Sequence, residues 1–301
     1  MLFEDSIIEC NELKGALFTS KKVTVSIARL DKIHPVVSGN KLFKLHYFLN
    51  ESISLGGKPI LTFGGAYSNH LVATAYACRL AGIPCTGIVR GEKPSLLSHT
   101  LRDCERYGMK LLYLSRENYH DKNLQALPGF TSDKYDDYII VPEGGYHPKG
   151  AAGAALIMEK LAGYDGTHIC MAVGTATTLA GILHANNNNT QIIAVPVLKN
   201  LLDINERLIY LGCTDLLQQP VIFDGYHFGG YAKKTPGLLQ FMNELYTEHS
   251  IPSDFVYTGK MLFAIMDKIK IGYFEAGSRI ICLHTGGLQG NSSLPVGTLV
   301  F

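Results

Sequence analysis

The sequence predicts an α/β protein made of two units, each an open, twisted and mostly parallel sheet covered by helices. Short β-rich runs alternate with helical patterns along most of the chain, and this alternation is typical of parallel sheets. Hydrophobic residues make up 47% and charged residues 18% of the 301 residues, which is enough apolar material for one large or two medium cores. Glycine-containing turns follow several predicted strands, at the sheet edge where ligands of such folds bind.

The first predicted unit spans residues 48–163 and forms the smaller domain. Its pattern predicts strands at 59–63, 84–89, 110–114 and 138–141, and helices at 68–81, 94–107 and 151–162. Residues 117–137 are polar and weakly patterned, so we expect a long surface connection there.

The second predicted unit combines residues 1–47 with 164–301 and forms the larger domain. Its expected strands are 168–173, 191–197 and 279–284, and its expected helices are 178–185, 238–249 and 260–271. The four-asparagine run at 186–189 lies between a helix and a strand and predicts a turn. We expect a ligand cleft between the two units, beyond the carboxyl ends of their strands.

Composition argues against several classes of function. The 27 basic and 26 acidic residues give a formal net charge of +1, which favours neither nucleic acid nor an anionic membrane surface as a partner. No apolar run reaches membrane-spanning length, and the acidic residues near the start are unlike a signal peptide. The seven cysteines include no Cys-x-x-Cys pair and predict reduced thiols in a cytoplasmic protein.

Lys41 is the most informative single residue. It follows Gly39-Asn40 at the opening of a helical stretch, and a lysine amine can hold an aldehyde cofactor as a Schiff base. Most lysines are solvated surface charges, so this lysine matters only together with the other motifs. Lys44 lies three residues further on, on the same helical face, and chemistry alone does not choose between the two amines.

Two turns between a strand and a helix are candidate anion sites. Gly64 to His70 and Val173 to Gly181 each follow a predicted strand and open a helix, whose free N–H groups and dipole attract a carboxylate or phosphate. The alternatives are a simple helix cap at Ser68 or Asn69 and, in the second turn, a helix start filled with β-branched residues.

Two further motifs complete a set suited to an aldehyde cofactor with a phosphate and a ring nitrogen. Thr285, in His284-Thr285-Gly286-Gly287, offers a hydroxyl at a strand end that could pair with a neutral ring nitrogen. Tyr257 could supply a phenol in the cleft, although buried structural tyrosines are more common. We expect Lys260 at the surface.

Motifs of several other enzyme classes are absent from the sequence. It contains no Gly-x-x-x-x-Gly-Lys-[Ser/Thr], Gly-x-Ser-x-Gly, His-Glu-x-x-His or Gly-x-Gly-x-x-Gly. P-loop enzymes, α/β-hydrolases, zincins and ordinary dinucleotide-binding enzymes therefore lose their main support.

In this order, the motifs resemble those of the fold-type-II pyridoxal-phosphate enzymes, and more narrowly the 1-aminocyclopropane-1-carboxylate deaminase / D-cysteine desulfhydrase family. Six blocks from about residue 33 to 290 carry the resemblance: 39–45, 64–70, 142–145, 174–181, 256–260 and 284–287. It implies a tryptophan synthase β-like fold, a pyridoxal 5'-phosphate cofactor in the cleft between the domains, and a homodimer.

The resemblance implies roles in cofactor binding. Lys41 would be the Schiff-base lysine, Asn69 would hydrogen-bond the cofactor's phenolic oxygen, and Thr285, beside Gly286, would meet the pyridine nitrogen. The phosphate would be bound by Gly174, Thr175, Ala176, Thr177 and Thr178. A hydroxyl partner makes the ring a weaker electron sink than a carboxylate would, and this favours elimination of a group from Cβ.

The resemblance also implies substrate contacts. Ser68 would hold the substrate carboxylate or assist proton transfer, next to Asn69 and His70, and Tyr257 and Tyr231 would line the substrate pocket. Lys41, Ser68 and Tyr257 are the expected catalytic residues.

Departures from the family pattern concern the cyclopropane ring-opening activity and the binding of the cofactor phosphate. The 1-aminocyclopropane-1-carboxylate deaminases typically have Glu at the position of Thr258 and Gln at that of Tyr67. Family members often have Arg at Phe43 and glycines at Ala176 and Thr177.

We therefore predict a pyridoxal-phosphate lyase or deaminase that acts on a small amino acid, by D-cysteine desulfhydrase-like β-elimination to a keto acid and ammonia. The alternatives are a 1-aminocyclopropane-1-carboxylate deaminase, a pyridoxal-phosphate-binding protein without turnover, and a nucleotide-binding oxidoreductase on a similar α/β layout.

Overall fold

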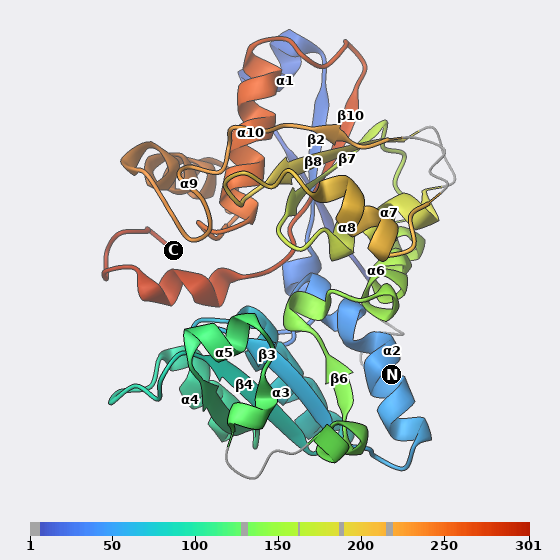
Figure 1. Ribbon diagram of the computed structural model, residues 1–301. Helices are drawn as coiled ribbons and strands as arrows, with labels where there is room; N and C mark the ends of the chain where they lie inside the picture. Colours follow the sequence, from blue (N-terminus) through green and yellow to red (C-terminus); the bar gives the residue numbers. More distant parts are fainter. Residues whose placement is uncertain (1–6, 128–131, 162, 187–189, 215–218) are drawn as a thin grey trace.

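The computed structural model describes residues 7–127, 132–161, 163–186, 190–214 and 219–301. It has two sheets, one in the upper and one in the lower part of Figure 1, each covered by helices. The predicted fold class, α/β with two mostly parallel sheets, is confirmed. Within the described residues, no helix combines the length and apolar character needed to cross a membrane.

The larger sheet has six strands in the order β1-β2-β10-β7-β8-β9. They are β1 (Cys10–Leu13), β2 (Thr24–Ala28), β10 (Arg279–Leu283), β7 (His168–Val173), β8 (Gln191–Pro196) and β9 (Val221–Ile222). Only the edge pair β1 and β2 is antiparallel. The central strands are buried on both faces, because helices cover both sides, and they read as continuous apolar runs.

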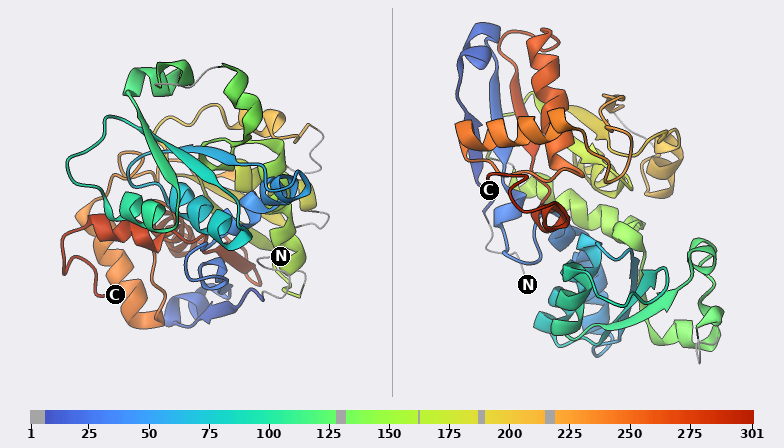
Figure 2. Two further views of the ribbon diagram at one scale, coloured as in Figure 1. Left: turned by 90° about the horizontal axis from the view of Figure 1, so that it is seen from below. Right: turned by 90° about the vertical axis from the view of Figure 1, so that its left-hand side faces the viewer.

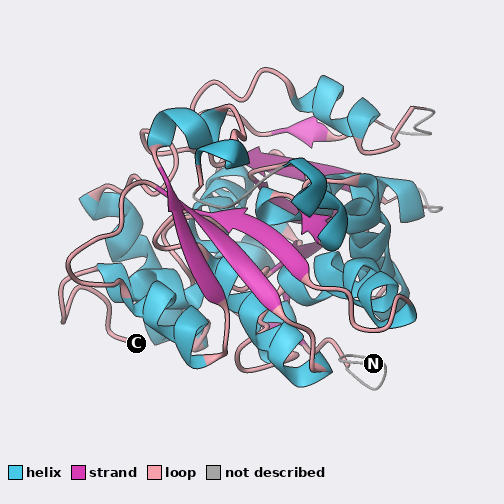
Figure 3. Cartoon of the chain, turned by 60° about the horizontal axis from the view of Figure 1, so that its bottom comes forward, coloured by secondary structure: helices cyan, strands magenta, loops and turns pink. Residues whose placement is uncertain are grey.

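The smaller sheet has four parallel strands in the order β5-β4-β3-β6. They are β5 (Lys110–Leu114), β4 (Cys85–Arg90), β3 (Ile60–Gly64) and β6 (Ile139–Val141), and the accompanying helices are α3 (Asn69–Ala81), α4 (His99–Arg106) and α5 (Arg116–His120). Figure 3, in which the lower part of the molecule is turned forward, shows strands in the foreground with helices beside and behind them.

The remaining helices are α1 (Ala16–Lys21), α2 (Asn40–Ser54), α6 (Pro148–Lys160), α7 (Thr177–Ala185), α8 (Ile204–Tyr210), α9 (Pro236–His249) and α10 (Thr258–Lys270). Short 3-10 turns occupy Leu30–Lys32, Leu124–Ala126, Ser132–Asp137, Glu143–Gly145 and Leu288–Ser293. Figures 1 and 2 show α6 where the upper and lower parts meet, and α2 running from there along the lower part.

Three of these helices, α2, α6 and α7, pack backbone against backbone. A Cβ built on Gly153 of α6 would lie 2.1 Å from the carbonyl oxygen of Phe43 in α2. A Cβ built on Gly181 of α7 would lie 2.4 Å from the carbonyl oxygen of Ala151 in α6. The missing side chains therefore let α6 join the first turns of α2 to α7, and this contact fixes where Lys41 lies.

Most predicted elements are present, and their boundaries differ for local reasons. The strands predicted at 110–114 and 168–173 coincide with β5 and β7. The helix predicted from residue 94 begins only at His99, because the Ser98 hydroxyl accepts a hydrogen bond from the Leu101 N–H (3.1 Å) and caps it there. The helix predicted from residue 151 begins earlier, at Pro148, and its predicted last residue, 162, lies outside the described residues.

Some predictions were incomplete. The segment before Lys41 contains β1, α1 and β2, and residues 117–137 contain helical turns rather than a plain connection. Residues 187–189 of the predicted asparagine turn lie outside the described residues.

The domain division stays a prediction. The strands of the smaller sheet all fall within 48–163, and those of the larger sheet fall within 1–47 and 164–301. The predicted boundary at 47/48 nevertheless lies inside α2, and α6 packs against α7. We propose the two-domain division with α2 and α6 as the shared layer between the domains.

The α6–α7 contact can be tested by substitution. We expect Gly181→Ala to lower the free energy of unfolding by about 2 kcal/mol or more, because its Cβ has no space between backbone atoms. Urea unfolding followed by circular dichroism measures the change. The matched control is Gly237→Ala in α9, where no heavy atom lies within 4 Å of the added Cβ and where stability should be unchanged or up to about 1 kcal/mol higher. Equal stability of the two variants would contradict the close packing.

Candidate functional site

The sequence motifs meet in space between the two sheets. A Cβ on Gly287 would lie 3.3 Å from the Asn69 side-chain nitrogen, which joins the turn after β10 to the start of α3. A Cβ on Gly174 would lie 3.2 Å from the Tyr257 ring, and the Asn40 amide donates to the Thr178 hydroxyl at 2.8 Å. Side chains far apart in sequence, from both units, therefore surround one site.

Lys41 is held at this site by the backbone around Gly39. Gly39 has φ +70°, and a Cβ there would lie 1.9 Å from the Thr285 carbonyl oxygen, so only glycine fits. The next N–H, of Asn40, donates to that same oxygen at 3.3 Å. The Lys41 Nζ donates to Asn40 Oδ1 at 2.7 Å and lies 5.6 Å from the centre of the Tyr257 ring.

Burial changes the protonation of Lys41. Removal from water lowers the pKa of its amine to about 8, and the attraction of the Asp254 carboxylate opposes this shift. A larger fraction of Lys41 is therefore unprotonated near neutral pH than for a solvated lysine. An unprotonated amine is the form that attacks an aldehyde or accepts a proton.

Lys44 is buried beside Lys41 and donates to the Gly144 carbonyl at 3.2 Å. Burial, and then repulsion from Lys41, lower its pKa well below the usual value. Within the described part of the chain, no carboxylate oxygen lies within ion-pair distance of either amine. Two buried amines without a counterion form a strong site for an anion.

The threonine loop between β7 and α7 supplies hydrogen-bond donors to the same place. The hydroxyls of Thr175 and Thr177 are 2.9 Å apart, and a Cβ on Gly144, whose carbonyl binds Lys44, would lie 3.1 Å from Thr175. The first N–H groups of α7 point into this loop. Ala176, at φ +64°, adopts the left-handed conformation that glycine adopts without strain.

The turn after β3 provides a helix cap and leads to an unpaired polar atom. Ser68 caps α3 by accepting from the Leu71 N–H at 3.3 Å, so the simple cap is present, and the free donors of the helix start remain beside it. Asn69 Oδ1 is buried and has no hydrogen-bond partner among the described residues. A buried polar atom of this kind suits a ligand.

His70 is a neutral imidazole. Thr62 donates its hydroxyl proton to the Val141 carbonyl (2.8 Å), so the 2.9 Å contact between Thr62 and His70 has the His70 Nε2–H as donor. The other nitrogen, Nδ1, is buried without a partner in the described structure. Burial, with the charges of Lys44 and Lys41, lowers the pKa of His70 to about 3.

Tyr257 lies at the start of α10, which the buried Asp254 organises. The Asp254 carboxylate accepts from the N–H groups of Val256 (2.9 Å), Tyr257 (2.7 Å) and Thr258 (3.0 Å). Burial raises the pKa of the Tyr257 phenol well above its usual value, and Tyr231 contributes through a hydrogen bond. Tyr257 therefore remains protonated and can act as a hydrogen-bond donor.

Tyr231 faces Tyr257, with ring centres 6.0 Å apart and an edge-to-face angle of 72°. It is half exposed, at 50%, so it lies at the rim of the site rather than inside it.

Thr285 is buried at the end of β10 and, with Gly286, adjoins the Gly39 turn. Its neighbour His284 is fully buried, and its Nε2–H donates to the Pro252 carbonyl at 2.7 Å. The strand end that carries the Thr285 hydroxyl is thereby fixed from both sides.

The expectation for Lys260 was wrong. Lys260 is fully buried, and its amine donates to two backbone carbonyls, those of His227 and Gly230, each at 2.8 Å. Asp254 was not anticipated either. A Ser-Asp pair just before a helix start is a capping signal that could have identified it.

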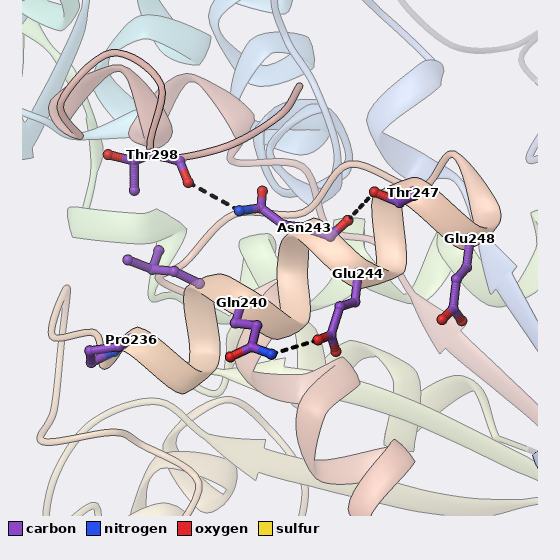
Figure 4. Close-up of a pocket in the computed structure, with 8 residues that line it drawn as sticks. Pro236, Gln240, Asn243, Glu244, Thr247, Glu248 and Thr298 are labelled. Atoms are coloured by element: carbon purple, nitrogen blue, oxygen red, sulfur yellow. Dashed lines mark hydrogen bonds between the residues drawn. The ribbon is translucent and has the colours of Figure 1, made fainter.

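A separate groove lies on the outer face of α9 and shares no residue with this site. It has a volume of ≈ 550 Å³ and is lined by α9 and the C-terminal segment. Figure 4 shows Asn243 donating to the Thr298 carbonyl across it, with Glu244 and Glu248 along the same helix.

A family model described as "Pyridoxal-phosphate dependent enzyme" matches residues 17–286. A Pyrococcus abyssi protein provisionally named 1-aminocyclopropane-1-carboxylate deaminase is 29% identical over 294 residues, covering 89% of this chain and 86% of that one. A protein of Yersinia enterocolitica named D-cysteine desulfhydrase is 24% identical, covering 87% of this chain and 86% of that one.

Among solved structures, one described as an ACC deaminase homologue superposes with a TM-score of 0.80 at 24% identity. It covers 96% of this chain and 92% of that one, and at that identity it shows the fold alone.

The protonation of Lys41 gives a prediction for the cofactor-free protein. Only the unprotonated amine reacts with an acylating reagent, so the rate of Lys41 modification should rise with pH and reach half of its limit at about pH 8. Peptide mass spectrometry over a pH series measures the rate, with the exposed Lys14 in the same sample as the control. If the modification rate of Lys41 reached half of its limit only near pH 10.5, the ordinary lysine pKa, the effect of burial would be contradicted.

Proposed function

The chain belongs to the family of pyridoxal-phosphate dependent enzymes, and we propose that it is a lyase that deaminates a small amino acid. The proposed reaction is β-elimination from D-cysteine, in which the amino acid and one water yield a keto acid, ammonia and hydrogen sulfide. The observation that carries the proposal is the pair of buried amines, Lys41 and Lys44, next to the start of α7.

The residues present fit pyridoxal phosphate. We assign the phosphate to the loop Gly174–Thr178 and the Lys44 amine, and the polar edge of the ring to Asn69 and Thr285. In support, Asn69 has a buried oxygen that lacks a protein partner in the described structure, and glycines leave room beside Tyr257 and Thr175. When bound, the cofactor would supply a reactive aldehyde and a ring that withdraws electrons from the substrate Cα.

We assign the chemical step to two residues. The Lys41 amine, whose pKa is lowered to about 8 by burial, removes the Cα proton. The Tyr257 phenol, which stays protonated, stabilises the departing group as a hydrogen-bond donor. The substrate carboxylate binds at the start of α3, where Ser68 and the free N–H groups of the first turn lie, with His70 as a neutral neighbour.

Thr258 supports elimination over opening of a cyclopropane ring. It is buried, directly follows Tyr257, and its hydroxyl has no partner in the described structure. No carboxylate therefore stands at the position where the deaminases that open the ring typically have glutamate. Since relatives of both names are similar to the chain, ring opening is the second candidate.

The proposal extends to location and assembly. All seven cysteines are free thiols, which supports a reducing compartment such as the cytoplasm. The homodimer is proposed from the family resemblance of the motifs.

The cofactor assignment predicts different behaviour for the two lysine variants. Wild type should gain a Schiff-base absorbance band when pyridoxal phosphate is added, and Lys41→Ala should not. Lys44→Ala should keep the band but bind the cofactor roughly tenfold to a hundredfold more weakly, because it loses one charged hydrogen bond to the phosphate. An absorbance titration measures both effects, and the reverse assignment would follow if Lys44→Ala alone lost the band.

The substrate assignment predicts keto acid and sulfide in equal amounts from D-cysteine, and a loss of at least about a thousandfold in kcat for Lys41→Ala. Coupled assays for both products provide the measurement. Keto acid formed from 1-aminocyclopropane-1-carboxylate but not from D-cysteine would replace the proposed activity with the second candidate. A spectrum that changes with no amino acid would indicate a cofactor-binding protein without turnover.

A further inference from the structure

One face of α10 fastens the loop that carries Tyr231. Lys260, Phe263 and Asp267 are spaced by three and four residues, so they share one face of the helix. Each makes a contact to the segment 226–231. The Lys260 amine binds the His227 and Gly230 carbonyls, the Phe263 ring meets the Phe228 ring edge to face at 5.0 Å, and Asp267 accepts from the Tyr226 hydroxyl at 2.5 Å.

The loop needs such fastening because of its backbone. Phe228, Gly229 and Gly230 have φ values of +53°, +94° and +118°, and a non-glycine residue at positive φ is strained. The loop is also partly exposed and has little apolar core of its own. Lys260, by contrast, is completely buried, so its ammonium depends on these carbonyls and on the nearby Asp254.

The loop leads directly to the substrate side of the site. Tyr231 follows Gly230, and its ring faces Tyr257, the residue directly before α10. The same helix therefore positions Tyr257 at its N-terminal end and Tyr231 through Lys260, one turn later. Loss of the lysine would release Tyr231 while leaving Tyr257, Lys41 and the threonine loop in place.

We propose that Lys260 is a positioning residue for substrate binding: by holding the His227 and Gly230 carbonyls, it keeps Tyr231 over the substrate pocket beside Tyr257. The inference deepens the proposed function and rests on it for the identity of the pocket. It concerns substrate affinity rather than cofactor binding, because the groups assigned to the cofactor lie on other elements.

The test compares Lys260→Met with Lys270→Met, an exposed position at the end of the same helix, and with Tyr231→Phe and the double variant Lys260→Met/Tyr231→Phe. Pyridoxal-phosphate titration, kcat and KM for D-cysteine, and the rate of limited chymotrypsin cleavage after residues 226–231 are measured for each.

We expect the cofactor affinity of Lys260→Met to stay within about twofold of wild type. Its KM should rise roughly tenfold, which corresponds to the loss of about one hydrogen bond to a charged donor. Its loop should be cleaved at least about tenfold faster. Lys270→Met should match wild type in all three measurements. The KM of the double variant should lie within about twofold of the KM of the more impaired single variant, because both substitutions remove the same contact of Tyr231.

Unchanged KM and unchanged cleavage in a folded Lys260→Met protein would overturn the proposal, and so would multiplicative effects in the double variant. If Lys260→Met does not fold, Tyr226→Phe removes the second anchor, and it must show faster loop cleavage and higher KM. If wild type turns over no amino acid, the proposed function fails, while the cleavage rates still decide whether Lys260 holds the loop.

Discussion

The burial of two lysine amines on the first turn of α2 is the constraint on which the rest of the site depends. A buried ammonium is costly unless it is paired, and the described residues offer Lys41 and Lys44 only an amide oxygen and a backbone carbonyl at hydrogen-bond distance. The cost appears as lowered pKa values for both lysines and for the neighbouring His70. A bound anion with a reactive carbonyl would reduce this cost in two ways, because it would pair with one amine and bond to the other.

The fold makes this burial possible through close backbone contacts. Gly39 lets α2 begin against the Thr285 carbonyl, and Gly153 and Gly181 let α6 and α7 approach without side chains between them. The first turns of α2 and α7 are thereby brought side by side, as the hydrogen bond between Asn40 and Thr178 shows. Parallel sheets on either side bring the motifs after β3, β6, β7 and β10 to the same place, since each of these follows the carboxyl end of a strand.

Much of this arrangement could be predicted from the sequence, because it is encoded locally. Buried strands such as 168–173 are continuous apolar runs, and the motif turns combine glycines with polar residues at strand ends. Interactions that depend on long-range packing were harder to predict. Lys260 looked like a surface charge because nothing in its neighbourhood in the sequence reveals two carbonyls 30 and 33 residues away. The strands β1 and β2 are short and pair with each other, and the pairing of β2 with β10 becomes visible only when the ends of the chain are brought together.

The most direct measurement of the central claim is the chemical identity of the amine that carries the cofactor. The protein is loaded with pyridoxal phosphate, reduced with borohydride, digested, and its peptides are sequenced by mass spectrometry. The account predicts a pyridoxyl phosphate group on Lys41 alone. A group on Lys44 would contradict the assignment of the two lysines, and a protein that carries no such group would contradict the account as a whole.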